Sequence, residues 1–389
     1  MVFIAIIFIN LNHRKLLKRV SGMGNYREDF HTEQISHKTA NAEIDEELRR
    51  LLEGHKTRIK VIGCGGAGNN TINRISEIGI KGVETIAMNT DAQDLLYTSA
   101  DKKLLIGKQL TQGLGAGSNP KIGEEAAKEN EHDIKKLLEG ADLVFITCGM
   151  GGGTGTGSAP FVAQVAKKMG ILSVGIITMP FSMEGSHRFE NAMIGLEKME
   201  QTINTLIVIP NEKLLELAPH LPLQTAFKVA DEILTNAVKG IAELVTRTGL
   251  VNLDFADVKT IMGQGGVALI GVGESDGENR ADESVQKALD NPLIDVDVSN
   301  ATGALINISG GENLTLDEAR RIVETVSSSL DPKAKIIWGA QIYKDLEKTI
   351  RTMVIITGVS SEQIFGEENT YFGQKKEELQ SELGIDFMG

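Results

Sequence analysis

The chain has 389 residues, a formal net charge of −13 and 41% hydrophobic residues. This length is typical of about two domains, each able to bury a core of its own. The acidic balance argues against nonspecific binding of nucleic acid, which needs a basic surface, so no nucleic-acid partner is expected.

The N-terminal segment, residues 1–57, is predicted to be an extension of the folded core. Its first nine residues, Met1–Ile9, are apolar, and basic residues follow between His13 and Arg19. The apolar run is too short to cross a bilayer, so no direct membrane insertion is expected. A secretory signal would place its charges first, and this segment does not. Two interpretations remain: an anchor on the membrane surface, or an upstream start that precedes a natural start at Met23.

A first domain is predicted over residues 58–221, where apolar strands alternate with helical stretches. Such alternation predicts an α/β fold with a doubly wound, mostly parallel sheet, whose ligands bind outside the carboxyl ends of the strands. Cys64 and Cys148 fall at strand ends and are expected to be buried, reduced thiols of a cytosolic protein. The six expected strands are Ile59–Ile62, Val83–Met88, Lys103–Ile106, Leu143–Thr147, Leu172–Thr178 and Thr205–Ile209.

Three glycine-rich loops occur in this domain. We call Gly63–Asn70 the first glycine loop, Gly113–Ser118 the second and Gly151–Gly157 the third. Glycines between a strand and a helix let backbone N–H groups converge on one point, and the start of the helix adds a partial positive charge, so such a loop suits phosphate. A helix is expected after the third loop, from Ser158 to Met169. No Lys follows the glycines of that loop, so it is not a P-loop.

The first glycine loop alone also resembles a dinucleotide-binding fingerprint. Asp91, at the end of the second strand, would then bind the ribose. This alternative is a nicotinamide-dependent oxidoreductase, but it leaves the other two loops without a role. Three glycine-rich loops at one edge of a sheet fit a triphosphate better than a pyrophosphate.

Residues 222–249 are predicted to form a long central helix that joins two domains. Pro222 suits its first turn, apolar residues recur with a period near 3.6, and Gly249 ends it. At ~1.5 Å per residue this helix is roughly 35 Å long. A smaller α+β domain is expected over residues 250–360, followed by a polar tail over 361–389. Its expected strands are Val267–Gly271, Ala304–Ile308, Lys335–Gln341 and Met353–Thr357, and its expected helices are Asp282–Leu289 and Thr315–Ser328.

Several motifs, in order along residues 58–360, resemble those of the FtsZ family, the prokaryotic relatives of tubulin that build the division ring. The third glycine loop is similar to the signature loop of that family, and Asn252–Asp257 is similar to its N-x-D-x-x-D catalytic loop. Each glycine loop alone is a weak signal, whereas the set is highly specific. The further matches are Asn89–Gln93, Pro180–Phe181 with Glu184 and Arg188, Pro210–Leu215, and Phe227 with Asp231.

The resemblance implies a cytoplasmic GTPase that hydrolyses GTP to GDP and phosphate and assembles head to tail into filaments of a mid-cell division ring. Residues 58–221 would be the GTP-binding domain. Glu184 would accept hydrogen bonds from the ribose and Arg188 would face the nucleotide; the alternative for both is an i,i+4 ion pair on a surface helix. The residues implied to hold the phosphates are Gly65, Gly66, Ala67, Gly68, Asn69 and Asn70 of the first loop, Gly151, Gly152, Gly153, Thr154, Gly155, Thr156 and Gly157 of the third, and, toward the γ-phosphate, Gly115, Ala116 and Gly117 with Asn89 and Asp91.

Phe227 and Asp231 lie four residues apart, on one face of the central helix. An aromatic ring can stack on a base, and a carboxylate can accept from both N1–H and the 2-amino group of guanine. Adenine offers neither donor, so a buried Asp231 would be left unpaired by ATP. Asn211 is expected to add a contact to the base. The alternative for Phe227 is an ordinary core position.

Asn252, Asp254 and Asp257 are the candidate catalytic residues: the resemblance implies Asn252, and Asp254 and Asp257 are acids that can orient and polarise a water against a γ-phosphate. The central helix would hold Asp254 and Asp257 roughly 30 Å or more from the nucleotide of the same chain, whereas a hydrogen bond reaches ~3 Å. These acids are therefore expected to act on the GTP of another subunit, and repeating that contact makes a filament. The alternative is a helix N-cap at Asp254 and a first-turn acid at Asp257.

The sequence shows no dense cluster of metal-binding side chains, so Mg²⁺ would be held mainly by phosphates and water. The tail ends in Leu383–Met388, after a charged spacer over Gln374–Glu382. This segment resembles the C-terminal peptide with which the family binds membrane-tethering division proteins; the alternatives are a terminus without a partner or a helix that packs on its own domain. A tubulin-like filament protein for cell shape or motility is the remaining alternative to a role in division.

Overall fold

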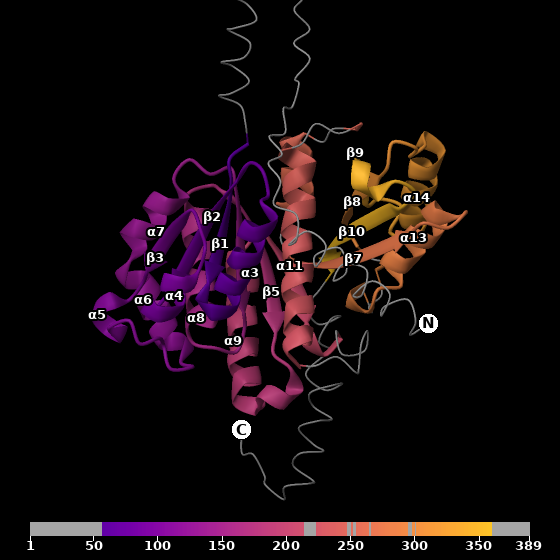
Figure 1. The fold of residues 1–389 in the computed structure, drawn as a ribbon. Helices are drawn as coiled ribbons and strands as arrows, with labels where there is room; N and C mark the ends of the chain where they lie inside the picture. Colours follow the sequence, from indigo (N-terminus) through magenta and orange to yellow (C-terminus); the bar gives the residue numbers. More distant parts are fainter. Residues whose placement is uncertain are drawn as a thin grey trace, which may run out of the picture. The chain divides into compact units, whose positions relative to one another are not determined.

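The described chain folds around a sheet of ten strands, which the computed structural model places in the order β3-β2-β1-β4-β5-β6-β7-β10-β8-β9 (Figure 1). The structure describes residues 57–213, 223–246, 250–251, 254–263, 266–294, 298–299 and 301–359. The strands are β1 Ile59–Cys64, β2 Val83–Asn89, β3 Lys102–Leu105, β4 Leu143–Gly149, β5 Leu172–Met179, β6 Thr205–Pro210, β7 Val267–Ser275, β8 Gly303–Gly310, β9 Lys335–Ile342 and β10 Ile350–Val359.

Strands β1 to β6 are all parallel, as the alternation of strands and helices predicts. Each is within two residues of its expected position at both ends. The helices between and after the strands are α3 Gly65–Ile78, α4 Ala92–Tyr97, α5 Lys108–Thr111, α6 Pro120–Glu129, α7 Glu131–Leu138, α8 Thr154–Lys168, α9 Ser186–Thr202, α11 Leu223–Thr246, α12 Phe255–Met262, α13 Arg280–Leu289 and α14 Leu316–Ser328, with short 3₁₀ turns η1 Ser182–Glu184, η2 Pro292–Ile294 and η3 Lys344–Leu346.

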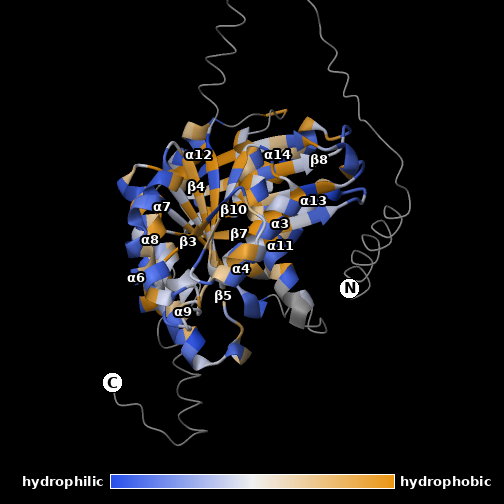
Figure 2. Ribbon diagram, turned by 60° about the vertical axis from the view of Figure 1, so that its left-hand side comes forward, coloured by the Kyte–Doolittle hydropathy of each residue, from blue (hydrophilic) through white to orange (hydrophobic). Residues whose placement is uncertain are grey.

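Both faces of the parallel sheet are covered by helices. Successive strand residues point to opposite faces, so Leu143 and Phe145 of β4 join a core with α3 and α11, whereas Val144 and Ile146 join a core with α6 to α9. Figure 2 shows the result as apolar strands between helices whose outer sides are hydrophilic. Burial on both faces leaves the edge at the strand ends as the place where loops can form a site.

Helix α8 begins earlier than we expected. Its first residue is Thr154, whereas the apolar pattern predicted a start at Ser158. The second half of the third glycine loop is thus the first turn of the helix. The first N–H groups of a helix have no partner within it, so this turn is free to donate to a ligand.

Helix α11 is the central helix that the 3.6-residue period predicts. It has 24 residues, or ~36 Å at ~1.5 Å per residue, and runs alongside the strands between β1–β6 and β7–β10 (Figure 1). Its buried residues Ala230, Leu234, Ala237, Ile241 and Leu244 follow the helical period. Pro222 and Gly249 lie outside the described residues, as do Asn252, the segment with Met23 and the tail peptide Leu383–Met388.

The second part of the sheet, β7 to β10, is mixed. Strand β7 continues the parallel sheet through two registered pairs with β6, and β10 is antiparallel to both β7 and β8. Helices α13 and α14 cover it with their own apolar core. All four strands and both helices overlap the elements predicted for the smaller α+β domain, although β7 continues four residues past its predicted end and β10 begins three residues before its predicted start.

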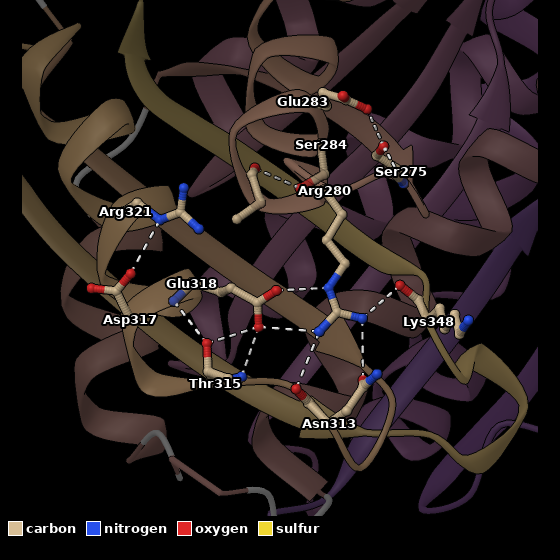
Figure 3. A network of polar contacts seen from close by, with 12 residues as sticks. Ser275, Arg280, Glu283, Ser284, Asn313, Thr315, Asp317, Glu318, Arg321 and Lys348 are labelled. Carbon is tan, nitrogen blue, oxygen red and sulfur yellow. Dashed lines mark hydrogen bonds and ion pairs between the residues drawn. The ribbon is translucent and has the colours of Figure 1, made fainter.

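Arg280 joins three segments of this second part (Figure 3). Its guanidinium donates to both carboxylate oxygens of Glu318 at 2.7 and 3.1 Å, to Asn313 and to the carbonyl oxygen of Lys348. Glu318 also completes the N-terminal capping box of α14 with Thr315. Partial burial would raise the pKa of Glu318, but the hydrogen bonds from Arg280 and Thr315 outweigh it and lower that pKa to about 2.

Candidate nucleotide-binding site

A cavity of about 350 Å³ lies at the carboxyl ends of β1, β4 and β5. This is the edge at which a doubly wound sheet is expected to bind its ligand. The cavity is lined by residues of the first and third glycine loops, of the turn after β5 and of helix α11, and by the residue that follows β6. The predicted site residues that line it are Gly65, Gly66, Ala67, Asn70, Gly152, Gly153, Thr154, Gly155, Glu184, Arg188, Asn211 and Asp231.

The first and third glycine loops interlock beneath this cavity. A Cβ atom on Gly65 would lie 2.8 Å from the backbone nitrogen of Gly155, and one on Gly155 would lie 2.9 Å from the carbonyl oxygen of Cys64. Gly65 also has a positive φ of 72°, which favours glycine. Helices α3 and α8 both begin here, so two sets of free N–H groups face the same cavity.

The second glycine loop packs against the third. Gly153 has no room for a side chain, because its Cβ would lie 2.8 Å from both the Ala116 methyl group and the backbone nitrogen of Asn119. The hydroxyl groups of Thr90 and Thr154 are 2.6 Å apart and tie the end of β2 to the same loop. All three loops therefore form one connected wall, as their place at one sheet edge predicts.

Other predicted phosphate residues lie in or behind this wall and do not line the cavity. Gly68 packs on the carbonyl oxygen of Thr147, Gly157 packs on that of Pro120, and Gly151 donates its N–H to the Thr156 hydroxyl group at 2.9 Å. Gly115, Ala116 and Gly117 belong to the second loop, where Ala116 is buried and Gly117 is exposed.

Asn69, Asn89 and Asp91 are committed to contacts within the protein. Both asparagine side-chain amides donate to Asp94 Oδ2, at 2.8 and 2.6 Å. Asp91 Oδ1 accepts from the backbone N–H groups of Gln93 and Asp94, so Asp91 is the N-cap of α4. These three residues shape the wall from behind.

Glu184 and Arg188 form an ion pair at the rim of the cavity. The pair is not carried by a single helix, because Glu184 ends η1 and Arg188 lies in α9. The backbone N–H of Phe181 donates to the other Glu184 oxygen at 2.9 Å. The turn after β5 and the start of α9 thus place one carboxylate and one cation at the edge of the cavity.

Asn211 and Asp231 form a polar pair of lining residues where the cavity meets β6 and α11. The side-chain oxygen of Asn211 is buried and has no hydrogen-bond partner among the described residues. Burial raises the pKa of Asp231 to about 6, against the opposing charge of Arg74. A guanine base would supply donors to the Asn211 oxygen and to the partly buried Asp231 carboxylate. Phe227 is a residue of α11, but its side chain lies outside the described part of the structure.

Residues that the sequence analysis did not assign also line the cavity. Most of them stand at the carboxyl ends of the central parallel strands, so their position in the strand pattern is the signal that would have identified them. Cys64 is buried, and burial raises the pKa of its thiol to about 12, which keeps it protonated and unreactive. The additional lining residues are Cys64, Ser118, Gly149, Met150, Thr178, Pro180 and Ala230.

Asp254 and Asp257 lie at the start of α12 and do not line this cavity. Helix α12 ends at the opposite edge, where the Thr205 hydroxyl group, at the start of β6, donates to the carbonyl oxygen of Met262. Asp254 caps α12 by accepting from the Ala256 N–H at 3.0 Å, and both acids are exposed. The structure thus brings together many of the residues predicted to bind nucleotide and leaves the two acids on a separate surface.

Within the ranges given above, no three His, Cys, Asp or Glu side chains converge as metal ligands. Among the same residues, no helix has both the length and the apolar character to cross a membrane.

Comparisons with known proteins agree on one family. The GTPase domain of the Tubulin/FtsZ family matches residues 58–219, and the C-terminal domain of the FtsZ family matches residues 266–360. The chain is 57% identical over 365 residues to cell division protein FtsZ 1 of Methanocaldococcus jannaschii, which spans 94% of this chain and 98% of that protein. It is 59% identical to cell division protein FtsZ 1 of Thermococcus kodakarensis, over 86% of this chain and 90% of that protein.

Solved structures give the same result. An FtsZ dimer from M. jannaschii superposes with a TM-score of 0.78 at 61% identity, over 82% of this chain and 93% of that chain. CetZ1 of Haloferax volcanii superposes with a TM-score of 0.69 at 21% identity, over 78% of this chain and 95% of that chain, which shows a shared fold alone.

Proposed function

The chain belongs to the FtsZ family of tubulin-like cell-division GTPases, and from this premise we propose that its GTP is hydrolysed between two copies of the chain stacked head to tail. It binds guanine nucleotide, hydrolyses GTP and forms filaments as a member of that family.

The cavity and the two acids lie far apart on one chain, and this separation supports a shared site. Strand β6 begins at the contact with α12 and ends beside Asn211, so its six residues separate the two regions by roughly 20 Å. Along α11, Asp231 and Thr246 are 15 residues apart, or ~22 Å, and Asp254 lies further along the chain. A hydrogen bond reaches only ~3 Å, so Asp254 and Asp257 act on the nucleotide of the next subunit.

Asp257 is the residue that orients the attacking water in this proposal. Asp254 already uses one oxygen to cap α12, whereas Asp257 is exposed in the first turn of the same helix. An exposed carboxylate at the end face of one subunit can accept a proton from water once the neighbour supplies a γ-phosphate. Asn252 belongs to the same motif, outside the described residues.

The guanine base fits the end of the cavity at Asn211 and Asp231, because the Asn211 oxygen has no partner among the described residues and the Asp231 carboxylate is an acceptor partly removed from water. The phosphates fit the backbone donors at the starts of α3 and α8, and Arg188 adds a cation at the rim. Backbone N–H groups and an arginine side chain bind anions and do not bind a metal cation directly. Mg²⁺ would accordingly be held by phosphate oxygens and water, and would neutralise part of the phosphate charge.

Dilution tests whether hydrolysis needs a second subunit. We expect the rate per molecule of the wild type to fall toward zero below a threshold concentration, while GTP binding persists there. A matched sample of Asp257→Ala should bind GTP equally well and hydrolyse none at any concentration. A rate per molecule that is independent of dilution would overturn the shared site.

Membrane tethering and mid-cell placement complete the proposed function. The tail peptide Leu383–Met388 would bind a membrane-tethering division protein and hold the filaments as a ring on the cytoplasmic side of the membrane. Imaging of the tagged chain in dividing cells separates this role from that of a shape or motility filament: a mid-cell ring supports division, and filaments that avoid the septum contradict it.

A further inference from the structure

Asp94 is an acidic residue that lies behind the wall of the cavity. It lies in the first turn of α4, where an acid interacts favourably with the helix dipole. Its side chain, however, turns away from its own helix. Asp94 Oδ2 accepts from Asn69 Nδ2 at 2.8 Å and from Asn89 Nδ2 at 2.6 Å.

Asn69 links Asp94 to the first glycine loop. Its side chain is 0% exposed, and because a carboxylate only accepts, the amide nitrogen of Asn69 must face Asp94. The amide oxygen is left buried and without a hydrogen-bond partner among the described residues. A buried acceptor in this state is uncommon in native proteins, and here it belongs to a loop expected to hold phosphates.

Asn89 links Asp94 to the second glycine loop. Its oxygen accepts from the backbone N–H groups of Thr90 and Asp91, at 2.8 and 3.3 Å. The next contacts reach the loop itself: Gly115 N donates to the Thr90 carbonyl oxygen at 3.3 Å, and Ala92 N donates to that of Gly113 at 3.0 Å. Hydrogen bonds, together with the backbone of Thr90, therefore connect the first loop through the Asp94 carboxylate to the second loop.

We propose that Asp94 is a positioning residue that couples the first glycine loop to the second, so that the second loop is held where a terminal phosphate can contact it. The inference rests on the proposed function, in which the first loop holds phosphates that GTP and GDP share and the second approaches the γ-phosphate. Removal of Asp94 frees Asn69 and Asn89 from each other. The affinity for GTP then falls more than the affinity for GDP.

The test compares nucleotide preference in four proteins. Dissociation constants for GDP and for a non-hydrolysable GTP analogue are measured on dilute full-length protein by displacement of a fluorescent guanine nucleotide. For Asp94→Ala we expect the preference to shift toward GDP by about tenfold, the effect of one charged hydrogen-bond network. Asp94→Asn keeps an oxygen that can accept both amides, and Gln93→Ala changes an exposed neighbour on the same helix, so both should stay within about twofold of the wild type.

The ratio of the two constants separates positioning from simple destabilisation. If the ratio of the two dissociation constants is unchanged in Asp94→Ala, whether or not both affinities fall, the inference is overturned. Asn89→Ala removes the hydrogen bond from Asn89 to Asp94 and should shift the preference toward GDP in the same way. It replaces Asp94→Ala in the test if that variant does not fold. A wild type that binds neither nucleotide would instead refute the proposed function, on which this inference depends.

Discussion

Asp231 is the residue whose burial bears most directly on the proposed function. It lies on α11 with its carboxylate against the cavity, where loss of water raises its pKa to about 6. Desolvation outweighs the attraction of Arg74, so ionisation of this carboxyl is costly in the absence of nucleotide. In the proposed site, guanine would offer its N1–H and 2-amino donors to Asp231, whereas adenine has neither at these positions, so the same burial would favour GTP over ATP.

Binding of guanine nucleotide should therefore depend on pH between about 5 and 7. Because the pKa of Asp231 is about 6, the ionised fraction falls from about nine-tenths at pH 7 to about a quarter at pH 5.5, and the GDP affinity should fall about fourfold. Asp231→Asn should bind weakly with no such slope. Titration with a fluorescent nucleotide across this range measures both proteins, and a flat wild-type profile would contradict the assignment.

The linked effect on stability has the opposite sign. The folded-state pKa of Asp231 is raised above the ordinary value of 3.8, so the nucleotide-free protein binds a proton more tightly when folded. Its contribution to the free energy of unfolding therefore declines as the pH rises from about 4 to about 6, and stays low above that range. Nucleotide reverses the loss by stabilising the ionised form.

At the scale of elements, the helices and strands were predictable where the pattern is local. The period of 3.6 located α11, and apolar runs located every strand of the sheet. The start of α8 was predicted wrongly because glycine has low helix propensity, whereas the interlocked loops hold Thr154–Gly157 in a first turn. The ion pair of Glu184 with Arg188 was foreseen as an i,i+4 pair, although not its place between η1 and α9, whereas the contacts of Asp94 were not predictable because they depend on which loops meet at the sheet edge.

The Arg280 network is a second feature that local pattern could not predict, because its partners lie 33 to 68 residues away along the chain. The side chains of Arg280 and Glu318 are only 11% and 13% exposed. Loss of one member of a buried ion pair leaves the other charge without compensation, which typically costs about 3–5 kcal/mol. The network thus fixes α13, α14 and the turn before β10 to one another.

Arg280→Ala should therefore lower the free energy of unfolding of the second part of the sheet by about 3 kcal/mol. The single tryptophan, Trp338, lies on β9 and reports unfolding of that part during a urea titration. Arg320→Ala is the matched control, because Arg320 pairs with Asp317 and Glu324 on an exposed face and its loss should leave the free energy of unfolding almost unchanged. Equal effects of the two substitutions would show that burial of the Arg280 pair contributes nothing.

At the scale of the whole molecule, the proposed nucleotide site and the proposed catalytic acids lie on different parts of one chain. The cavity lies at the carboxyl edge of the parallel strands, and α12 is fixed to the amino edge. The order of motifs along the sequence was sufficient to predict this separation, because a long helix lies between Asp231 and Asp254. A heterologous contact between these two parts repeats without closing and makes a filament.

The tail is predicted to place the filaments without taking part in the reaction. Deletion of residues 380–389 should leave GTP hydrolysis and filament formation within about twofold of the wild type, since neither of these two parts includes them. The same deletion should abolish the mid-cell ring of the tagged protein. A loss of hydrolysis on deletion would show instead that the segment packs on its own domain.

Complementation between two inactive variants tests the shared active site most directly. Asp257→Ala keeps the cavity and lacks the catalytic acid, whereas Asp231→Ala keeps the acids and binds GTP poorly. Mixed in equal amounts, they should recover up to about a quarter of the wild-type hydrolysis rate, the share of head-to-tail contacts that join an intact cavity to intact acids. A mixture that hydrolyses no more GTP than the two variants measured separately would contradict a site formed between subunits.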